Sequence, residues 1–169
     1  MSTLILYTTK YGNTTKCAEA LAKKLKGQVD VKPLTDNMPE LNGYDTVVLG
    51  GSMYAGKMQK AMVSFAGTFL DTLLSKKIAL FVCCMSEEFG ENQIKSSFPE
   101  ALVNHAVAYA RLGGGFTFSK MKGMDKFIMK MVTKADAKKK GVPVNTDYTT
   151  DRFTLSEEAV DKLAAALNA

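Results

Sequence analysis

Hydroxyl, amide and glycine residues are concentrated in one short segment near the amino end of the chain. Residues 7–15 read YTTKYGNTT, between a run of strand-forming residues and a helical pattern. A tight turn at Gly12 would let successive backbone N–H groups converge, and the amino end of the following helix would add partial positive charge. Thr9, Asn13 and Thr14 add side-chain donors. This combination predicts a binding site for a terminal phosphate.

Other phosphate-binding motifs are excluded by their residues. A nucleoside triphosphate loop needs GxxxxGK[ST] and a dinucleotide-binding fold needs GxGxxG, and neither occurs in the chain. A phosphate-accepting receiver domain would need a carboxylate at the end of its third strand, where this chain has Gly50. A mononucleotide remains as the predicted ligand. An ordinary helix cap is the alternative use of such a hydroxyl-rich turn.

The elements that must position this turn alternate between strands and helices. Short apolar runs predict parallel strands at residues 3–8, 29–34, 46–50, 77–85 and 106–112. Helical periodicity predicts helices at 14–26, 59–74 and 97–104, and a last helix with Thr154 and Glu157 as its capping box. The pattern predicts one α/β domain over residues 1–169, a three-layer doubly wound parallel sheet whose ligand crevice lies at the carboxyl ends of the strands.

The turn resembles the phosphate loop of the flavodoxin family, with Thr9, Gly12, Asn13 and Thr14 matching and Lys10 and Tyr11 departing from it. The resemblance implies a five-stranded sheet in the order 2-1-3-4-5 and FMN as the non-covalent cofactor. The departure at Lys10 and Tyr11 implies that one side-chain hydrogen bond to the phosphate is either missing or replaced by Lys10, while the backbone N–H groups still donate. The resemblance also implies that three further segments hold the flavin, after the third, fourth and fifth strands: Ser52, Met53, Tyr54, Ala55 and Gly56; Cys83, Cys84 and Met85; and Gly114.

Within those segments each residue type has an expected use. Tyr54 is expected to stack on the isoalloxazine, although a single loop tyrosine is often simply exposed. Ala55 and Gly56 leave room for a peptide group to approach the flavin N5. Backbone amides near Cys83 and Cys84 are expected to hold the pyrimidine carbonyls, while the thiols themselves pack. Gly114 permits either a close backbone approach or an irregular strand.

A more specific resemblance lies in the segment GGGFTFSKMKGMDKFIMKMV at residues 113–132. It is similar to the menaquinone-dependent protoporphyrinogen dehydrogenases, a flavodoxin-fold family, through Asp125, Lys126, Phe127 and the methionines that follow. This resemblance implies an FMN oxidoreductase that takes electrons from a porphyrinogen and gives them to a quinone. A flavodoxin that only carries single electrons between partner proteins is the alternative. No catalytic acid or base is assigned.

A row of like charges occupies the same segment. Lys122, Lys126, Lys130 and Lys134 recur every four residues, a spacing that weakly disfavours an isolated helix. Beside them run apolar residues, namely Met121, Met124, Phe127, Ile128 and Met131. Such a face suits an anionic membrane surface, an acidic partner or the propionates of a porphyrin. Equally, the methionines could pack on the sheet while the lysines meet water.

Composition sets the remaining limits. The 169 residues are 46% hydrophobic and 23% charged with a net charge of +5, which is ordinary for a globular domain and excludes a disordered chain. Nucleic acid is not an expected partner, because no nucleic-acid-binding motif accompanies the basic balance. Three cysteines without disulfide spacing and the lack of a secretory leader predict a cytoplasmic protein, with peripheral association at the inner face of the membrane as an option.

Overall fold

The computed structural model describes residues 1–35, 40–54, 56–85, 90–144 and 147–169. Its strands are β1 (Ser2–Thr8), β2 (Gln28–Pro33), β3 (Thr46–Tyr54), β4 (Lys57–Met58), β5 (Lys77–Cys83), β6 (Ala108–Phe116) and β7 (Arg152–Leu155). Its helices are α1 (Asn13–Ala22), α2 (Lys60–Thr68), α3 (Leu70–Leu74), α4 (Gly90–Ser97), α5 (Glu100–His105), α6 (Gly123–Lys140) and α7 (Glu157–Asn168), with a 3₁₀ turn at Leu41–Gly43. Ala55, one of the expected site residues, lies outside the described residues.

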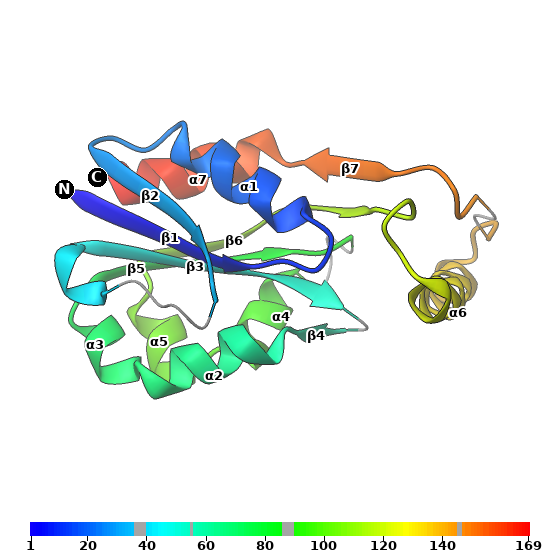
Figure 1. The fold of residues 1–169 in the computed structure, drawn as a ribbon, viewed down its shortest axis with the longest axis horizontal. Coiled ribbons are helices and arrows are strands. Elements are labelled where there is room, and N and C mark those ends of the chain that lie inside the picture. The colour runs from blue at the N-terminus through cyan, green and yellow to red at the C-terminus, as the bar shows by residue number, and fades with distance from the viewer. Residues whose placement is uncertain (36–39, 55, 86–89, 145–146) are drawn as a thin grey trace.

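Five parallel strands form the centre of the sheet in the order β2-β1-β3-β5-β6, which confirms the predicted order. The central strands are continuous apolar runs because helices cover both of their faces. Figure 1 shows α1 and α7 over one face and α2 to α5 over the other. The carboxyl ends of β1, β3, β5 and β6 therefore meet at one edge, where the segments expected to bind a ligand begin.

Two antiparallel additions were not predicted. The short strand β4 pairs with the end of β3, and β7 pairs with β6 at the edge of the sheet. In β7, Phe153 and Leu155 pack against the core while Arg152 and Thr154 are exposed. Because these residues are extended, α7 begins only at Glu157, and Ser156 caps it by accepting a hydrogen bond from the N–H of Ala159 (3.3 Å). The predicted capping box at Thr154 and Glu157 is wrong.

Two helical regions differ from their predicted form. The single helix expected at residues 59–74 is divided into α2 and α3 at Phe69, whose backbone leaves the helical region. The helix expected at 97–104 starts after Pro99 as α5, and α4 precedes it without having been predicted. Apolar periodicity continues across both breaks, so the periodicity alone could not show them.

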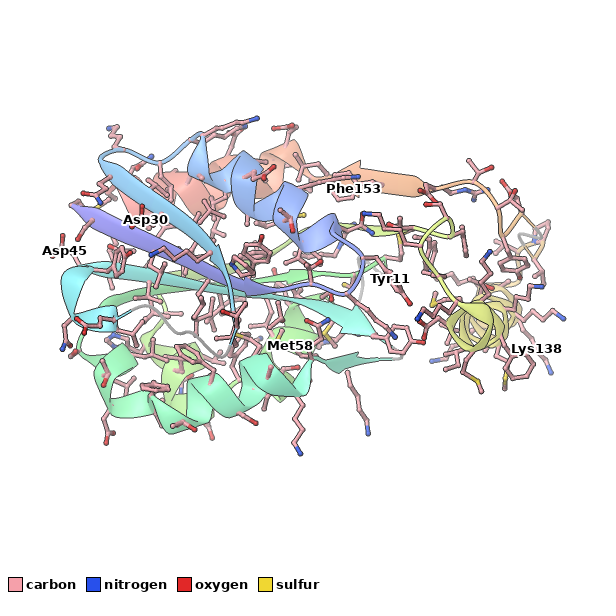
Figure 2. The ribbon with its side chains drawn as sticks, viewed as in Figure 1. Tyr11, Asp30, Asp45, Met58, Lys138 and Phe153 are labelled. Carbon is pink, nitrogen blue, oxygen red and sulfur yellow. The ribbon has the colours of Figure 1, made fainter. Side chains whose placement is uncertain are left out.

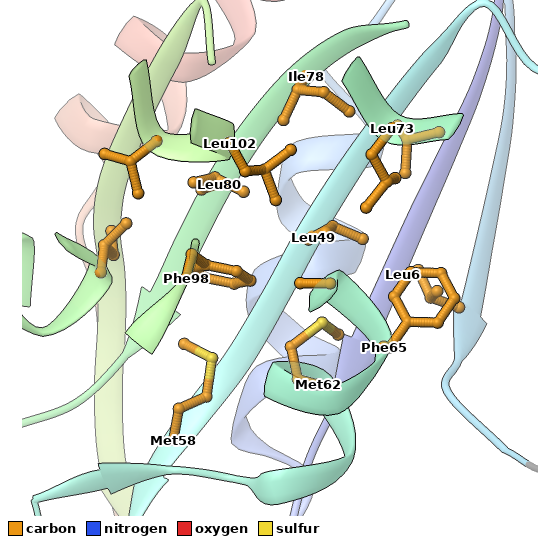
Figure 3. Packing of buried hydrophobic residues seen from close by; sticks show 14 of the residues in the cluster. Leu6, Leu49, Met58, Met62, Phe65, Leu73, Ile78, Leu80, Phe98 and Leu102 are labelled. Atoms are coloured by element: carbon orange, nitrogen blue, oxygen red, sulfur yellow. The ribbon is translucent and has the colours of Figure 1, made fainter. Parts of the chain in front are cut away.

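The core lies on the two faces of the sheet. Alternate residues of each strand point to opposite faces, so Leu6, Leu49 and Leu80 pack under α2 to α5, as Figure 3 shows. Their neighbours Ile5 and Val48 pack with Leu163 of α7 on the other face. A Cβ atom on Gly50 would lie 2.0 Å from the Phe81 ring, so glycine at this position lets the ring fill the core.

Helix α6 does not pack on the sheet. It lies beyond the carboxyl ends of the strands, as Figure 1 shows. Met121 and Met129 are buried in a small cluster with Phe118, whereas Met124 and Phe127 are 72% and 59% exposed. The alternative in which the methionines of this segment cover the sheet is therefore wrong. Within the described residues, no helix is both long enough and apolar enough to cross a membrane.

Candidate functional site

A cavity of about 530 Å³ lies between the carboxyl end of the sheet and α6. The turn after β1, the ends of β3, β5 and β6, and the inner side of α6 all contribute to its wall. The expected site residues that line it are Thr9, Lys10, Tyr11, Asn13, Ser52, Met53, Tyr54, Gly56, Cys83, Cys84 and Met85. Gly12, Thr14 and Gly114 are not part of the lining, although they belong to the same loops. The structure thus brings together segments that the sequence assigned to one ligand.

The turn after β1 has the backbone form that an anion site requires. Gly12 takes a left-handed conformation (φ 91°) as the N-cap of α1, and its N–H donates to the Thr9 hydroxyl (2.9 Å). Among the described residues no side chain caps α1, and its first turn holds no acidic residue. The first N–H groups of the helix are therefore left for a ligand with negative charge.

The side chains of Asn13 and Thr14 face in different directions. Asn13 lines the cavity, and its amide oxygen accepts a hydrogen bond from Thr117 (3.5 Å). Thr14 is fully buried, and its hydroxyl lies near the Cys83 thiol. A phosphate role for Thr14 stays a prediction, and it would fall to the backbone N–H rather than to the hydroxyl.

The rest of the cavity wall is mostly apolar, with one buried hydroxyl beside the turn. Within the described chain, the Ser52 hydroxyl is buried at the cavity without a hydrogen-bond partner. A buried oxygen in that state costs free energy unless a ligand or water pairs with it. Met53, Met85 and Phe116 supply flat or flexible apolar surface nearby. The cavity therefore offers N–H donors for a phosphate and apolar walls for a ring. The Ser52 hydroxyl, which can donate and accept, is available for a hydroxyl group of the ligand.

Four polar side chains form a cluster where α6 meets the loops. Asp125, in the first turn of α6, accepts hydrogen bonds from the hydroxyls of Tyr11 and Tyr54 and from Lys10 Nζ (2.9 Å). Lys10 Nζ also lies 3.5 Å from the centroid of the Tyr54 ring. Figure 2 shows Tyr11 between the end of β1 and α6. Lys10 thus contacts Asp125, so its expected use as a phosphate donor stays a prediction without support from this contact.

The ionisation of these groups follows from their contacts. The hydrogen bonds from Tyr11, Tyr54 and Lys10 hold the pKa of Asp125 well below its usual range. Burial, and then the hydrogen bond to Asp125, raises the pKa of Tyr11 to about 12. The same two causes raise the pKa of Tyr54. At neutral pH the cluster therefore consists of one carboxylate, one ammonium and two neutral phenols.

The cysteines at the end of β5 and Gly114 in β6 have structural positions. Cys83 and Cys84 are buried, and burial raises the pKa of the Cys83 thiol, which keeps it protonated and unreactive. A Cβ atom on Gly114 would lie 2.2 Å from the carbonyl oxygen of Cys84. Glycine at this position therefore allows β6 to run against the loop that follows β5.

Sequence reasoning missed the part of the site that α6 and β7 supply. Met129, Val132 and Ala137 of α6 line the cavity together with Lys140 and Arg152. Asp125 was noted as part of a resemblance but not as a site residue. The available signal was weak, namely one early acidic residue in a lysine-rich helix and an alternating pattern in residues 152–155.

Comparison with known proteins supports the interpretation of this geometry. Residues 4–142 match the family described as a flavodoxin domain. Protoporphyrinogen IX dehydrogenase [quinone] of Escherichia coli (strain K12) is 27% identical over 153 residues, which cover 79% of this chain and 80% of that protein.

Solved structures share the fold at low sequence identity. The flavodoxin of Streptococcus pneumonia TIGR4 aligns with a TM-score of 0.57 at 16% identity, covering 99% of this chain and 97% of that one. A short-chain flavodoxin associated with a non-canonical PDU bacterial microcompartment aligns with a TM-score of 0.57 at 17% identity, with coverage of 99% and 97%. At this identity the likeness concerns the fold alone.

The residues present fit FMN. The uncapped amino end of α1 suits its phosphate, the unpartnered Ser52 hydroxyl suits a polar group of the ligand, and the apolar walls beside Tyr54 suit its ring system. The family match covers most of the sequence, from the first strand into α6 and the residues just after it. The chain therefore belongs to the flavodoxin family, and its cofactor is FMN.

Proposed function

We propose that this FMN redox protein is an oxidoreductase that oxidises a porphyrinogen-type substrate and passes the electrons to a quinone. The observation that supports this proposal is the extent of the cavity. It continues from the loops expected to hold FMN to the inner side of α6, which adds an apolar wall of Met129, Val132 and Ala137. Lys140 and Arg152 line it as well, and Arg152 also pairs with Asp147 (3.2 Å). Apolar surface beside two cations suits a flat apolar substrate that carries carboxylates.

The E. coli relative supports the same substrate class, since its name specifies protoporphyrinogen IX and a quinone. When bound, FMN supplies the chemistry of accepting and donating electrons. The chain contributes binding and orientation: residues 9–14 hold the phosphate, and Ser52, Met53, Tyr54, Gly56 and Met85 surround the ring. Lys140 and Arg152 bind substrate carboxylates, and the apolar side of α6 excludes water.

The test has two stages. Absorbance and mass of the cofactor released from purified protein identify the flavin. Steady-state oxidation of protoporphyrinogen IX with a menaquinone analogue then measures the activity. We expect Arg152→Gln and Lys140→Gln to raise KM several-fold with little change in kcat, because they remove charges that bind the substrate. The matched control is Lys162→Gln on α7, whose ammonium pairs with Glu158 (2.6 Å) on the exposed surface.

The alternative function gives a different result in this test. Protein that holds FMN and exchanges electrons with protein partners, but leaves porphyrinogen and quinone unchanged, would support a one-electron carrier. That result would contradict the proposed enzyme while leaving the FMN assignment intact.

We also propose that α6 contacts an anionic membrane surface, at the cytoplasmic face of the membrane. Met124, Phe127 and Met131 lie on one side of the helix and are 72%, 59% and 58% exposed. Lys122, Lys126, Lys130 and Lys134 lie along the same helix or at its start. Exposed apolar residues next to lysines suit the interface of a bilayer with anionic lipids, where a quinone would also be found.

Sedimentation with vesicles tests this surface. We expect the protein to sediment with vesicles rich in phosphatidylglycerol but not with neutral vesicles, and Lys126→Glu with Lys130→Glu to abolish it. Lys23→Glu with Lys26→Glu makes the same charge change at exposed positions after α1 and serves as the control. Wild-type protein that never sediments with anionic vesicles would contradict the proposal.

A further inference from the structure

A single carboxylate in α6 contacts the ends of two neighbouring strands, β1 and β3, which pair in parallel as far as Thr8 and Gly51. Tyr11 and Lys10 belong to the turn after β1, and Tyr54 is the last residue of β3. One oxygen of Asp125 accepts from Tyr11, and the other accepts from both Tyr54 and Lys10. The phosphate turn, the loop expected at the flavin ring and the first turn of α6 are therefore connected at one residue.

In this cluster the negative charge of Asp125 is paired with the positive charge of Lys10. The Asp125 side chain is 20% exposed and that of Lys10 is 35% exposed, so the ion pair is partly shielded from water. Lys10 also covers one face of the Tyr54 ring, which lines the cavity and packs against the cluster of Phe118, Met121 and Met129. Removing the carboxylate would leave two phenol donors and an ammonium without their shared acceptor.

Asp125 is well placed to hold α6 against the domain, because the other contacts between α6 and the cavity loops are few. Met121 and Met129 pack with Phe118, and Tyr11 and Tyr54 border the same cluster. The two tyrosines thus pack with their rings against this cluster and bind α6 through their hydroxyls. Farther along the helix, the Thr133 and Tyr148 hydroxyls lie 3.1 Å apart. The first turn of α6 is therefore the point where a charged side chain, the Asp125 carboxylate, binds the helix to the cavity loops.

We propose that Asp125 is a positioning residue that docks α6 onto both flavin loops and holds the Tyr54 ring at the wall of the cavity. This role rests on the proposed use of the cavity for FMN. FMN bound as expected would reach from the phosphate turn to the β3 loop, and Asp125 ties α6 to those same two segments. Binding of FMN and docking of α6 consequently favour one another, and the coupling is equal in both directions.

Titration of FMN into apo protein tests the coupling. We expect Asp125→Ala to weaken FMN binding by about tenfold and to reduce the quenching of bound flavin fluorescence, because Tyr54 is no longer held beside the ring. Asp125→Asn keeps the size of the side chain but not its charge and gives an intermediate result. Asp125→Glu, which keeps the charge, restores part of the quenching. A melting curve for each variant shows whether it is folded.

Trypsin supplies a measurement that does not depend on the flavin. Lys126, Lys130 and Lys134 lie in α6, and a protease cleaves there only when the helix unfolds locally, which undocking favours. We expect faster cleavage in α6 for Asp125→Ala than for wild type, and slower cleavage of wild type when FMN is added. The matched control is Asp71→Ala, which removes an acidic residue from the first turn of α3.

The outcomes separate this inference from the function on which it rests. If FMN binds and Asp125→Ala changes neither its affinity, its fluorescence nor the cleavage of α6, the positioning role is wrong. If wild-type protein does not bind FMN, the cofactor assignment fails. In that case cleavage of the apo proteins still decides whether Asp125 docks α6.

Discussion

The turn at residues 9–14 and helix α6 form two walls of the same cavity, but they are held in place differently. The turn connects β1 and α1, whose residues Ile5, Cys17 and Leu21 are fully buried in the core. Helix α6 contacts the domain through a small cluster and the hydrogen bonds of Asp125, while Met124 on its outer side is 72% exposed. The turn should therefore lose its structure only when the whole domain unfolds, whereas α6 can detach from the cavity in a local opening.

The largest expected effect comes from a cavity in the sheet. Leu49→Ala removes a fully buried side chain from β3 and should lower the free energy of unfolding by about 2–5 kcal/mol. Met129→Ala in α6 should lower it by no more than about 1 kcal/mol, because that region can open by itself. Urea unfolding of the apo protein measures both. Equal losses would mean that α6 is part of the same cooperative unit.

Two glycines with the same backbone requirement sharpen the comparison. Gly12 (φ 91°) begins α1 and Gly141 (φ 64°) ends α6, so an alanine at either position should cost roughly 1–2 kcal/mol of strain. We expect Gly12→Ala to weaken FMN binding by about tenfold as well, since it distorts the phosphate turn. Gly141→Ala should leave the affinity unchanged in the same fluorescence titration. Equal effects on affinity would show that the turn has no special role.

The start of α7 gives a smaller effect. Ser156→Ala removes the N-cap and should lower the free energy of unfolding by about 1 kcal/mol. The control is Thr154→Ala, which affects an exposed position in β7 and should change stability by less than about 0.5 kcal/mol. Chemical denaturation distinguishes the two. If Thr154→Ala lowered the free energy of unfolding more than Ser156→Ala, the result would support Thr154 as the N-cap and contradict the structure.

The smallest expected effect is a pH dependence confined to the contact between α6 and the loops. The pKa of Tyr11 is raised in the folded protein from 10.0 to about 12, so its contribution is fully present below pH 10 and is lost as the pH rises towards 12. We expect trypsin cleavage of α6, measured after brief exposure to each pH, to increase over this range. Tyr11→Phe cannot ionise, so its cleavage should change less. The same increase in both proteins would assign the effect to other groups.

Much of the sheet end could be predicted from the sequence, because its signals lie within short segments. The apolar runs predicted the five parallel strands, and Gly12 with Asn13 and Thr14 located the turn proposed to bind phosphate. The direction of individual side chains was beyond these signals: Thr14 faces Cys83, and Lys10 faces Asp125. Helix breaks at Phe69 and Pro99 were also missed, since apolar periodicity does not depend on whether one helix or two carry it.

The sequence by itself determined the positions of the five parallel strands and the turn proposed to bind a phosphate, and the order of the strands followed from its resemblance to the flavodoxin family. The first two depend on contiguous residues whose spacing reflects backbone geometry directly. Only the tertiary structure decided that β7 completes the sheet edge, that α6 closes the cavity and that Asp125 meets two tyrosines 114 and 71 residues away in the chain. Such contacts depend on which distant segments the packed core brings together, and no local pattern encodes them.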